Sequence, residues 1–216
     1  MGRKRARRTT MAALAWIEPR EVIVPGYSGS MNPDVHPGDI ILVQRVYHHA
    51  YSPETVRYVN SDLVAGITHA WEKAGLPVRM GAAVCVDQML DSNATKQAIR
   101  YRLVEHGEKQ VNCVDMESYY VLEVLEEFGI PTGIVRVITD YADETIGLDF
   151  SRIPRGKWRQ RRYFFTHPKQ WMVFRELVRT CNMARVHLTQ YLDCYLSARI
   201  KINEVQTPAP PTFSDI

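Results

Sequence analysis

The sequence is poor in cysteine and contains no C-x-x-C pair. Its four cysteines, Cys85, Cys113, Cys181 and Cys194, are widely separated and have apolar neighbours. This pattern does not indicate the disulfide framework that stabilises many small secreted domains. We interpret the four residues as buried free thiols of a protein in the reducing cytoplasm.

Long apolar runs are also lacking. The basic N-terminal residues are followed by a short apolar stretch, residues 11–17, which is broken by Glu18, Pro19 and Arg20. This stretch is too short to span a bilayer and is not typical of a signal peptide. We therefore expect a cytoplasmic protein that has no membrane partner.

Neither sign of charge dominates the sequence. The 27 Lys and Arg residues are nearly balanced by 24 Asp and Glu residues, which leaves a net charge of +3. Much of the excess lies in two local clusters, residues 3–8 and 152–162. A basic surface for nucleic acid is not implied, and we interpret the run at residues 3–8 as a solvated basic end.

What is present is an ordinary globular composition. With 216 residues, of which 45% are hydrophobic and 24% charged, the chain suits one domain with a sizeable core. We predict a single α/β domain over residues 1–200, followed by a Pro-rich and disordered tail at residues 201–216. No internal repeat is visible.

The stretch from Gln110 to Asp143 shows the organisation of the domain most plainly. Two short apolar runs, Val111–Val114 and Gly133–Thr139, flank a segment whose apolar residues recur at helical spacing. This pattern predicts a strand, a helix and a second strand parallel to the first. Both strands should then end at the same edge of one sheet, which is where open α/β sheets bind ligands. Two carboxylates, Glu117 and Asp140, are expected to meet at that edge.

Similar patterns predict further elements on either side. We expect strands over residues 21–25, 40–47 and 78–86, and helices from about residue 5 to 16, over 61–74, over 94–106 and from Pro168 to about residue 196. Gly26–Ser30 reads as a turn of small residues that allows close approach of a ligand. Residues 146–165 read as an irregular loop. The alternation of strands and helices indicates an α/β layered fold.

Several motifs together resemble one family. They are V-D-M-E-S at Val114–Ser118, V-R-V-I-T-D-Y-A-D at Val135–Asp143, P-G-Y-S-G-S at Pro25–Ser30 and P-G-D-I-I-L-V at Pro37–Val43. Their order and spacing are similar to those of the nucleoside phosphorylase and nucleosidase superfamily, and within it to methylthioadenosine/S-adenosylhomocysteine nucleosidases. The resemblance implies a three-layer α/β/α fold with a mixed, largely parallel central sheet. It also implies cleavage of the N-glycosidic bond of a purine nucleoside, by phosphorolysis or hydrolysis.

The resemblance also implies roles for individual residues. Asp140 would be the general acid that protonates the leaving purine, and Glu117 would bind the ribose hydroxyls. The remaining implied substrate-binding residues are Met116, Ser28, Gly29, Met89, Leu90, Thr139, Ala142 and Phe150. No cofactor and no metal is implied, although inorganic phosphate would be a co-substrate of a phosphorylase.

The proposed chemistry demands different environments for the two carboxylates. A purine leaves poorly as an anion, so Asp140 must hold a proton, and the pKa of an ordinary Asp near about 3.9 must be raised by burial or by a neighbouring acid. Glu117 must stay charged in order to accept hydrogen bonds from hydroxyl groups, and a position in the first turn of a helix favours an anion.

The sequence also departs from the family. Asp115 stands where nucleosidases usually carry Glu, and the similarity begins inside the turn before a helix, so the domain is expected to be N-terminally truncated. The missing opening strands include the acidic residue with which the hydrolases activate water. Their loss would leave a sheet edge that needs cover, so we expect at least a homodimer.

Two other functions remain open at this point. The chain could bind nucleosides or dimerise without turnover. It could also be an α/β-hydrolase-like esterase, because Ser28, Asp140 and either His167 or His187 occur in the chain order of such a triad, although the motif around Ser28 lacks its last glycine. His48 and His49 have no ligand-spaced partner in the sequence, so we do not expect a metal site there.

Overall fold

The structure is a computed structural model that describes residues 2–90, 92–144 and 156–206. Phe150 and the tail from Thr207, both subjects of prediction above, lie outside these residues. The helices are α1 (Arg3–Leu14), α2 (Ser61–Lys73), α3 (Asn93–Glu105), α4 (Ser118–Glu127), α5 (Lys157–Thr166) and α6 (Pro168–Gln206). The strands are β1 (Val22–Ser30), β2 (Ile40–His48), β3 (Arg57–Tyr58), β4 (Arg79–Cys85), β5 (Val111–Asp115) and β6 (Thr132–Ile138).

The strands form one mixed sheet in the order β3-β2-β4-β5-β1-β6. The longest ladders are parallel, between β1 and β6 and between β2 and β4. A further antiparallel pairing joins β2 to β6. The sheet is therefore curved, and β6 at one end of the strand order lies beside β2 near the other end. The structure therefore confirms the predicted α/β fold with a mixed central sheet.

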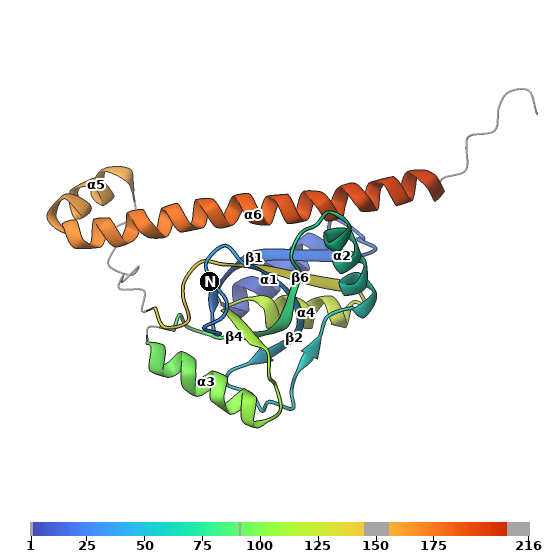
Figure 1. Cartoon of the computed structure of the whole chain (residues 1–216), viewed down its shortest axis with the longest axis horizontal. Coiled ribbons are helices and arrows are strands. Elements are labelled where there is room, and N and C mark those ends of the chain that lie inside the picture. Colours follow the sequence, from blue (N-terminus) through green and yellow to red (C-terminus); the bar gives the residue numbers. More distant parts are fainter. Residues whose placement is uncertain (1, 91, 145–155, 207–216) are drawn as a thin grey trace, which may run out of the picture.

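Helices cover both faces of this sheet. Helix α4, with α1 packed behind it, contacts β2, β4 and β6 from one side, whereas α2 and α6 pack on β6 from the other (Figure 1). Near β4 and β5, Leu103 of α3 packs with Ala82 and Val84, while the alternate residues Ala83 and Cys85 belong to the main core on the α4 side. This alternation is what a strand buried on both faces requires.

The predicted parallel relation between the strands on either side of α4 is wrong. β5 and β6 are not neighbours, because β1 lies between them, antiparallel to β5 and parallel to β6. The antiparallel pairing covers only the ends of the two strands, with Gly29 opposite Val114. Since Ser28 of β1 is also paired with Ile138 of β6, the C-terminal ends of all three strands meet at one place. The predicted convergence holds, but for a different geometric reason.

The prediction that the small-residue segment Gly26–Ser30 forms a turn is wrong. The segment is the second half of β1. Its glycines are needed because buried charged side chains cross the strand. A Cβ atom added to Gly26 would lie 2.2 Å from Nη1 of Arg136, and one added to Gly29 would lie 2.8 Å from Oδ1 of Asp140. Small residues therefore mark close approach here, as expected, but within a strand.

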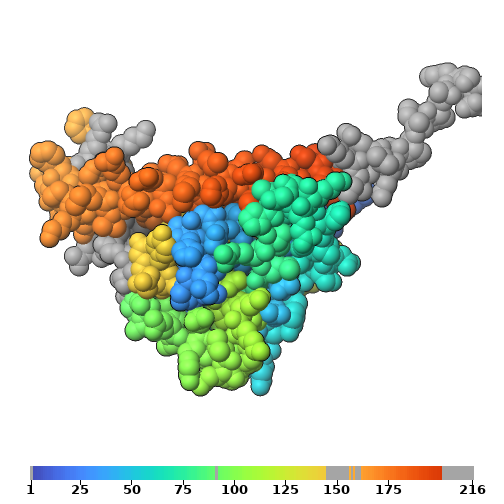
Figure 2. Space-filling view, viewed as in Figure 1, coloured from blue at the N-terminus to red at the C-terminus, as the bar shows by residue number. Residues whose placement is uncertain are grey.

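The C-terminal part differs most from the prediction. Residues 157–166, expected to be irregular, form helix α5, and α6 begins at Pro168 as predicted but continues to Gln206. Helix α6 lies across the domain, and its N-terminal end extends past the sheet together with α5 (Figure 2). Its inner face is anchored by Trp71 of α2, whose Nε1 donates to the carbonyl oxygen of Tyr191 at 2.9 Å. Across the described ranges, no helix is long and apolar enough to cross a bilayer.

Candidate active site

A cavity of about 350 Å³ lies where the ends of β1, β5 and β6 meet. It is lined by Tyr27, Ser28, Gly29, Val86, Met89, Leu90, Lys96, Val114, Asp115, Met116, Glu117, Thr139 and Asp140. Eight of the ten residues predicted for the site are among them, including both carboxylates. Glu117 and Asp140 thus open into a common cavity.

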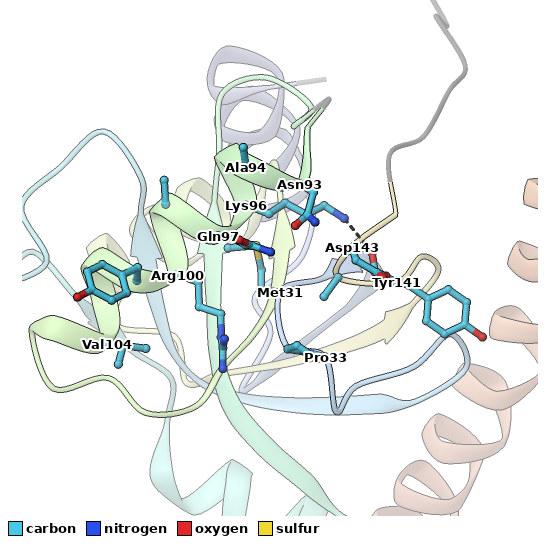
Figure 3. Close-up of a pocket in the computed structure, with 13 residues that line it drawn as sticks. Met31, Pro33, Asn93, Ala94, Lys96, Gln97, Arg100, Val104, Tyr141 and Asp143 are labelled. Atoms are coloured by element: carbon cyan, nitrogen blue, oxygen red, sulfur yellow. Dashed lines mark hydrogen bonds between the residues drawn. The ribbon is translucent and has the colours of Figure 1, made fainter.

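Of the other two predicted residues, one lines a different cavity and one lies outside the described residues. Ala142 lines a larger one, of about 810 Å³, between α3, the segment after β1 and the segment after Asp140 (Figure 3). Phe150 lies outside the described residues. Lys96 lines both cavities, so its side chain forms part of the wall that separates them.

Asp140 lies two residues after the end of β6 and is only 4% exposed. Its Oδ2 atom accepts a hydrogen bond from Nζ of Lys96 at 2.6 Å, and both side chains are almost fully buried. Burial raises the pKa of Asp140, and this effect outweighs the lowering by the Lys96 ammonium; Glu144 adds to the increase. The raised pKa is the property that a general acid needs, as the sequence led us to expect.

Glu117 occupies the N-cap position of α4, and its side chain makes no capping hydrogen bond. It is half-buried, and burial, followed by the charge of nearby Asp115, raises its pKa. The favourable helix-terminus effect that we expected for Glu117 is therefore outweighed by desolvation. With no capping contact to hold it, the carboxylate is free to accept hydrogen bonds from a ligand in the cavity.

Asp115, where the family usually has Glu, performs the capping instead. Its Oδ1 accepts hydrogen bonds from the backbone N–H groups of Glu117 and Ser118, at 3.0 and 2.9 Å. Its Oδ2 accepts from Nε of Arg136 at 2.8 Å and from the Ser118 hydroxyl. Burial opposes ionisation of Asp115, but these partners lower its pKa overall. A shorter carboxylate at this position therefore fixes the start of α4 and the direction of Glu117.

The apolar predicted residues line the cavity in different ways. Met116 and Leu90 are partly buried against the smaller core cluster, whereas the side chain of Met89 is 45% exposed. Thr139 donates through Oγ1 to the carbonyl oxygen of Ser28 at 3.2 Å, which ties β6 to β1. Among the described residues, the hydroxyl of Ser28 is buried and has no hydrogen-bond partner. It is therefore a polar group available inside the cavity.

The histidines needed for an esterase are engaged elsewhere. Nδ1 of His187 lies 2.9 Å from the carbonyl oxygen of Gly38, and Nδ1 of His167 lies 2.9 Å from that of Tyr163. Neither forms a hydrogen bond with Ser28 in the described part of the chain. The Ser–His contact that defines such a triad is thus not formed.

The fold gives His48 and His49 an acidic neighbour, Asp87, that the sequence did not suggest. The hydrogen bonds around His48 nevertheless oppose metal binding. Its Nδ1 accepts from the backbone N–H of Ala50, so Nε2 holds the proton that faces the hydroxyl of Tyr120, and Tyr120 in turn donates to Asp87. A metal ion on Nε2 would leave the proton on Nδ1, opposite another N–H group. We interpret the cluster as a chain of hydrogen bonds that runs from Ala50 through His48 and Tyr120 to Asp87.

Lys96 is the site residue that the sequence did not reveal. It belongs to α3, 44 positions before Asp140, so only the tertiary fold brings the two together. One signal was available: Lys96 lies in the N-terminal part of its helix, where a positive charge is unfavourable unless it has a partner.

Comparisons with known proteins agree with this geometry. The sequence matches the phosphorylase superfamily over residues 1–154. It is 26% identical over 163 residues to a 5'-methylthioadenosine/S-adenosylhomocysteine nucleosidase of Glaesserella parasuis, covering 69% of each chain. It is 22% identical to an aminodeoxyfutalosine nucleosidase of Helicobacter pylori, covering 69% of this chain and 68% of that one.

Solved structures show the same fold. The nucleosidase of Neisseria meningitidis, in complex with methylthio-immucillin-A, superposes with a TM-score of 0.68 at 17% identity, covering 92% of this chain and 78% of that one. The futalosine hydrolase of Helicobacter pylori gives 0.67 at 18% identity, covering 92% and 76%. The motifs, the fold and the match over residues 1–154 agree: this chain belongs to the phosphorylase superfamily.

Proposed function

We propose that the protein cleaves the N-glycosidic bond of a purine nucleoside. The observation that supports this proposal most directly is the shared cavity of Glu117 and Asp140, which has the size of a small-molecule site. The relatives named nucleosidases support the same reaction class.

In this mechanism Asp140 is the general acid. As the bond between sugar and base breaks, the sugar becomes oxocarbenium-like and negative charge develops on the purine. A proton transferred from the carboxyl group of Asp140 to a ring nitrogen neutralises that charge. The burial that raises the pKa of Asp140 favours the protonated form that this role requires.

Glu117 binds the sugar. Its carboxylate, which makes no capping hydrogen bond, accepts hydrogen bonds from ribose hydroxyls. A negative charge beside the ring also stabilises the positive charge that develops there. Met116 packs on the sugar, and Met89 and Leu90 border the base, while Ser28 and Gly29 form the floor of the cavity. Water or inorganic phosphate then attacks the sugar carbon.

The test is release of adenine from methylthioadenosine by the purified protein, measured with and without inorganic phosphate. Release without phosphate identifies hydrolysis, and release that depends on phosphate identifies phosphorolysis. If methylthioadenosine binds but no base is released under either condition, the protein is a nucleoside-binding module and the enzymatic proposal is wrong. Adenosine and inosine, assayed in parallel, report on the choice of base and 5′ substituent.

A further inference from the structure

We propose that Lys96 is a positioning residue that sets the acidity of Asp140 and stabilises the carboxylate formed when the proton leaves. This inference rests on the proposed function, because it assigns a role within the same site. It concerns a residue that acts through Asp140.

The contacts of Lys96 are those of a residue built into the site. It is 5% exposed, and its ammonium group donates to Oδ2 of Asp140 at 2.6 Å, to the carbonyl oxygen of Tyr141 at 3.1 Å and to that of Glu144 at 3.5 Å. All three of its N–H groups are thus used. The side chain fixes the orientation of Asp140. Its bond to the carbonyl oxygen of Tyr141 also fixes the course of the chain just after Asp140 (Figure 3).

Burying the ammonium group of Lys96 costs free energy even when its N–H groups are paired. A buried ammonium loses its hydration, and attraction to a single carboxylate often does no more than offset that loss. The position is unfavourable as well, since Lys96 lies near the N-terminal end of α3. Because only one oxygen of Asp140 is bonded to Lys96, the other can face a ligand in the cavity.

The ammonium group matters most when Asp140 gives up its proton. While Asp140 carries its proton, its attraction to the Lys96 ammonium group is weak. Once the proton moves to the purine nitrogen, Asp140 becomes a carboxylate beside a cation, and an ion pair forms. The interaction is therefore stronger in the transition state than in the ground state, which is the condition for it to accelerate the reaction. The step moves one proton, from Asp140 to the purine nitrogen.

Glu144, on the segment after β6, raises the pKa of Asp140, whereas the Thr139 side chain lowers it as Lys96 does. Glu117 lines the same cavity. Cys181 of α6 is also close enough for Asp140 to raise its pKa. Of the described groups that act on Asp140, Lys96 is the cation, so its removal should leave burial and acidic neighbours to dominate.

The test compares Lys96→Met and Lys96→Arg with the wild type in the pH profile of kcat/KM for base release. The basic limb of this profile marks the loss of the proton from Asp140 in the free enzyme. Lys96→Met keeps the length of the side chain and removes the charge, so the limb should move upward by about 1–3 pH units. The rate on the plateau should fall by at least about tenfold, because Asp140 becomes a weaker acid. Lys96→Arg should restore the position of the limb.

Three controls separate the possible causes. Lys73→Met removes an exposed lysine from α2 and should leave the profile unchanged. Thermal melting shows whether each variant is folded, and ¹³C NMR titration of the Asp140 carboxyl group follows its pKa without turnover, with an upward shift expected in Lys96→Met. If the limb and the NMR titration stay in place in a folded Lys96→Met protein, the proposal for Lys96 is wrong, whereas the proposed function stands. If the wild type releases no base, both proposals fail.

Discussion

Glu117 shows how one residue can be identified from sequence while its electrostatics depend on the fold. Its position after a predicted strand placed it at the sheet edge, and the structure puts it there. Its pKa, however, is raised by burial and by Asp115, two contributions that arise only when β5 and α4 are in place. Lys96 depends on the fold even more than Glu117 does, because no local sequence pattern connects it to Asp140.

Glu117 should make nucleoside binding sensitive to acid. The carboxylate form accepts hydrogen bonds from ribose, and the raised pKa means that this form is lost, as pH falls, at a higher pH than for an ordinary Glu. Isothermal titration with a non-cleavable nucleoside analogue should show affinity that weakens as the pH falls, beginning at a higher pH than for an ordinary Glu. Glu117→Gln should bind more weakly at neutral pH and should lose this pH dependence. Equal affinity of wild type and variant at pH 7 would contradict the role of Glu117.

Gly29 should tolerate no side chain. The Cβ atom of Gly29→Ala would approach Asp140 to 2.8 Å at Oδ1 and 3.0 Å at Oδ2, so the carboxyl group would have to move from its bond with Lys96. We expect a loss of kcat/KM of about 10²-fold, the effect of displacing a reacting group by about an ångström. Gly66→Ala is the matched control, because the added atom meets nothing within 4 Å. Wild-type kcat/KM in Gly29→Ala would show that Asp140 is not held where we describe it.

At the scale of single elements, periodicity predicted most of the fold. Strand β5, helix α4 and strand β6 lie within about a residue or two of their predicted bounds, because each has a clear apolar pattern. The predicted bounds of β1 end too early, because glycines usually signal turns. In this strand the glycines make room for the side chains of Arg136 and Asp140. Helix α5 was missed because its Arg-rich and aromatic sequence has no apolar stripe. The local pattern fails where long-range contacts determine the structure.

The start of α4 depends on the buried pair of Asp115 and Arg136. Asp115→Ala would leave Arg136 buried without its carboxylate and would remove the cap of α4. We expect the free energy of unfolding to fall by about 3–5 kcal/mol. Urea denaturation monitored by circular dichroism measures it, with Asp62→Ala, an exposed first-turn acid of α2, as a control that changes little.

The contribution of Asp115 should also depend on pH. Because its pKa is lowered in the folded state, the stabilisation is present above the unfolded pKa and is lost as pH falls through the folded value. The difference in stability between wild type and Asp115→Ala should therefore shrink in acid. A difference that is small at pH 7, or constant down to the acid range, would contradict this account of the pair.

At the scale of the whole molecule, the surface suggests self-association. On one side β1 pairs with β6 from Val22 to Ser28, but on the other side its described pairs with β5 are limited to Gly29 and Ser30, so most of that edge is open. Helix α6 also carries exposed apolar side chains, among them Trp171 and Met172. Open strand edges and apolar patches are often covered by a second copy.

We therefore expect multi-angle light scattering at micromolar concentration to give at least twice the chain mass of 24.9 kDa. Paired substitution of Trp171 and Met172 by Gln should shift the population towards the monomer if α6 takes part in the contact. Substitution of the exposed Tyr101 on α3 is the control and should leave the mass unchanged. A wild-type protein that remains monomeric would exclude self-association as the way these surfaces are covered.

The central claim, that Asp140 protonates the leaving base, is tested most directly by one measurement. It is kcat/KM for purine release by Asp140→Asn compared with the wild type, at neutral pH and with folding verified by thermal melting. Asn keeps the shape of the side chain but has no acidic proton to give, so the account predicts a loss of about 10²–10⁴-fold. A folded Asp140→Asn protein that releases purine at the wild-type rate would contradict it.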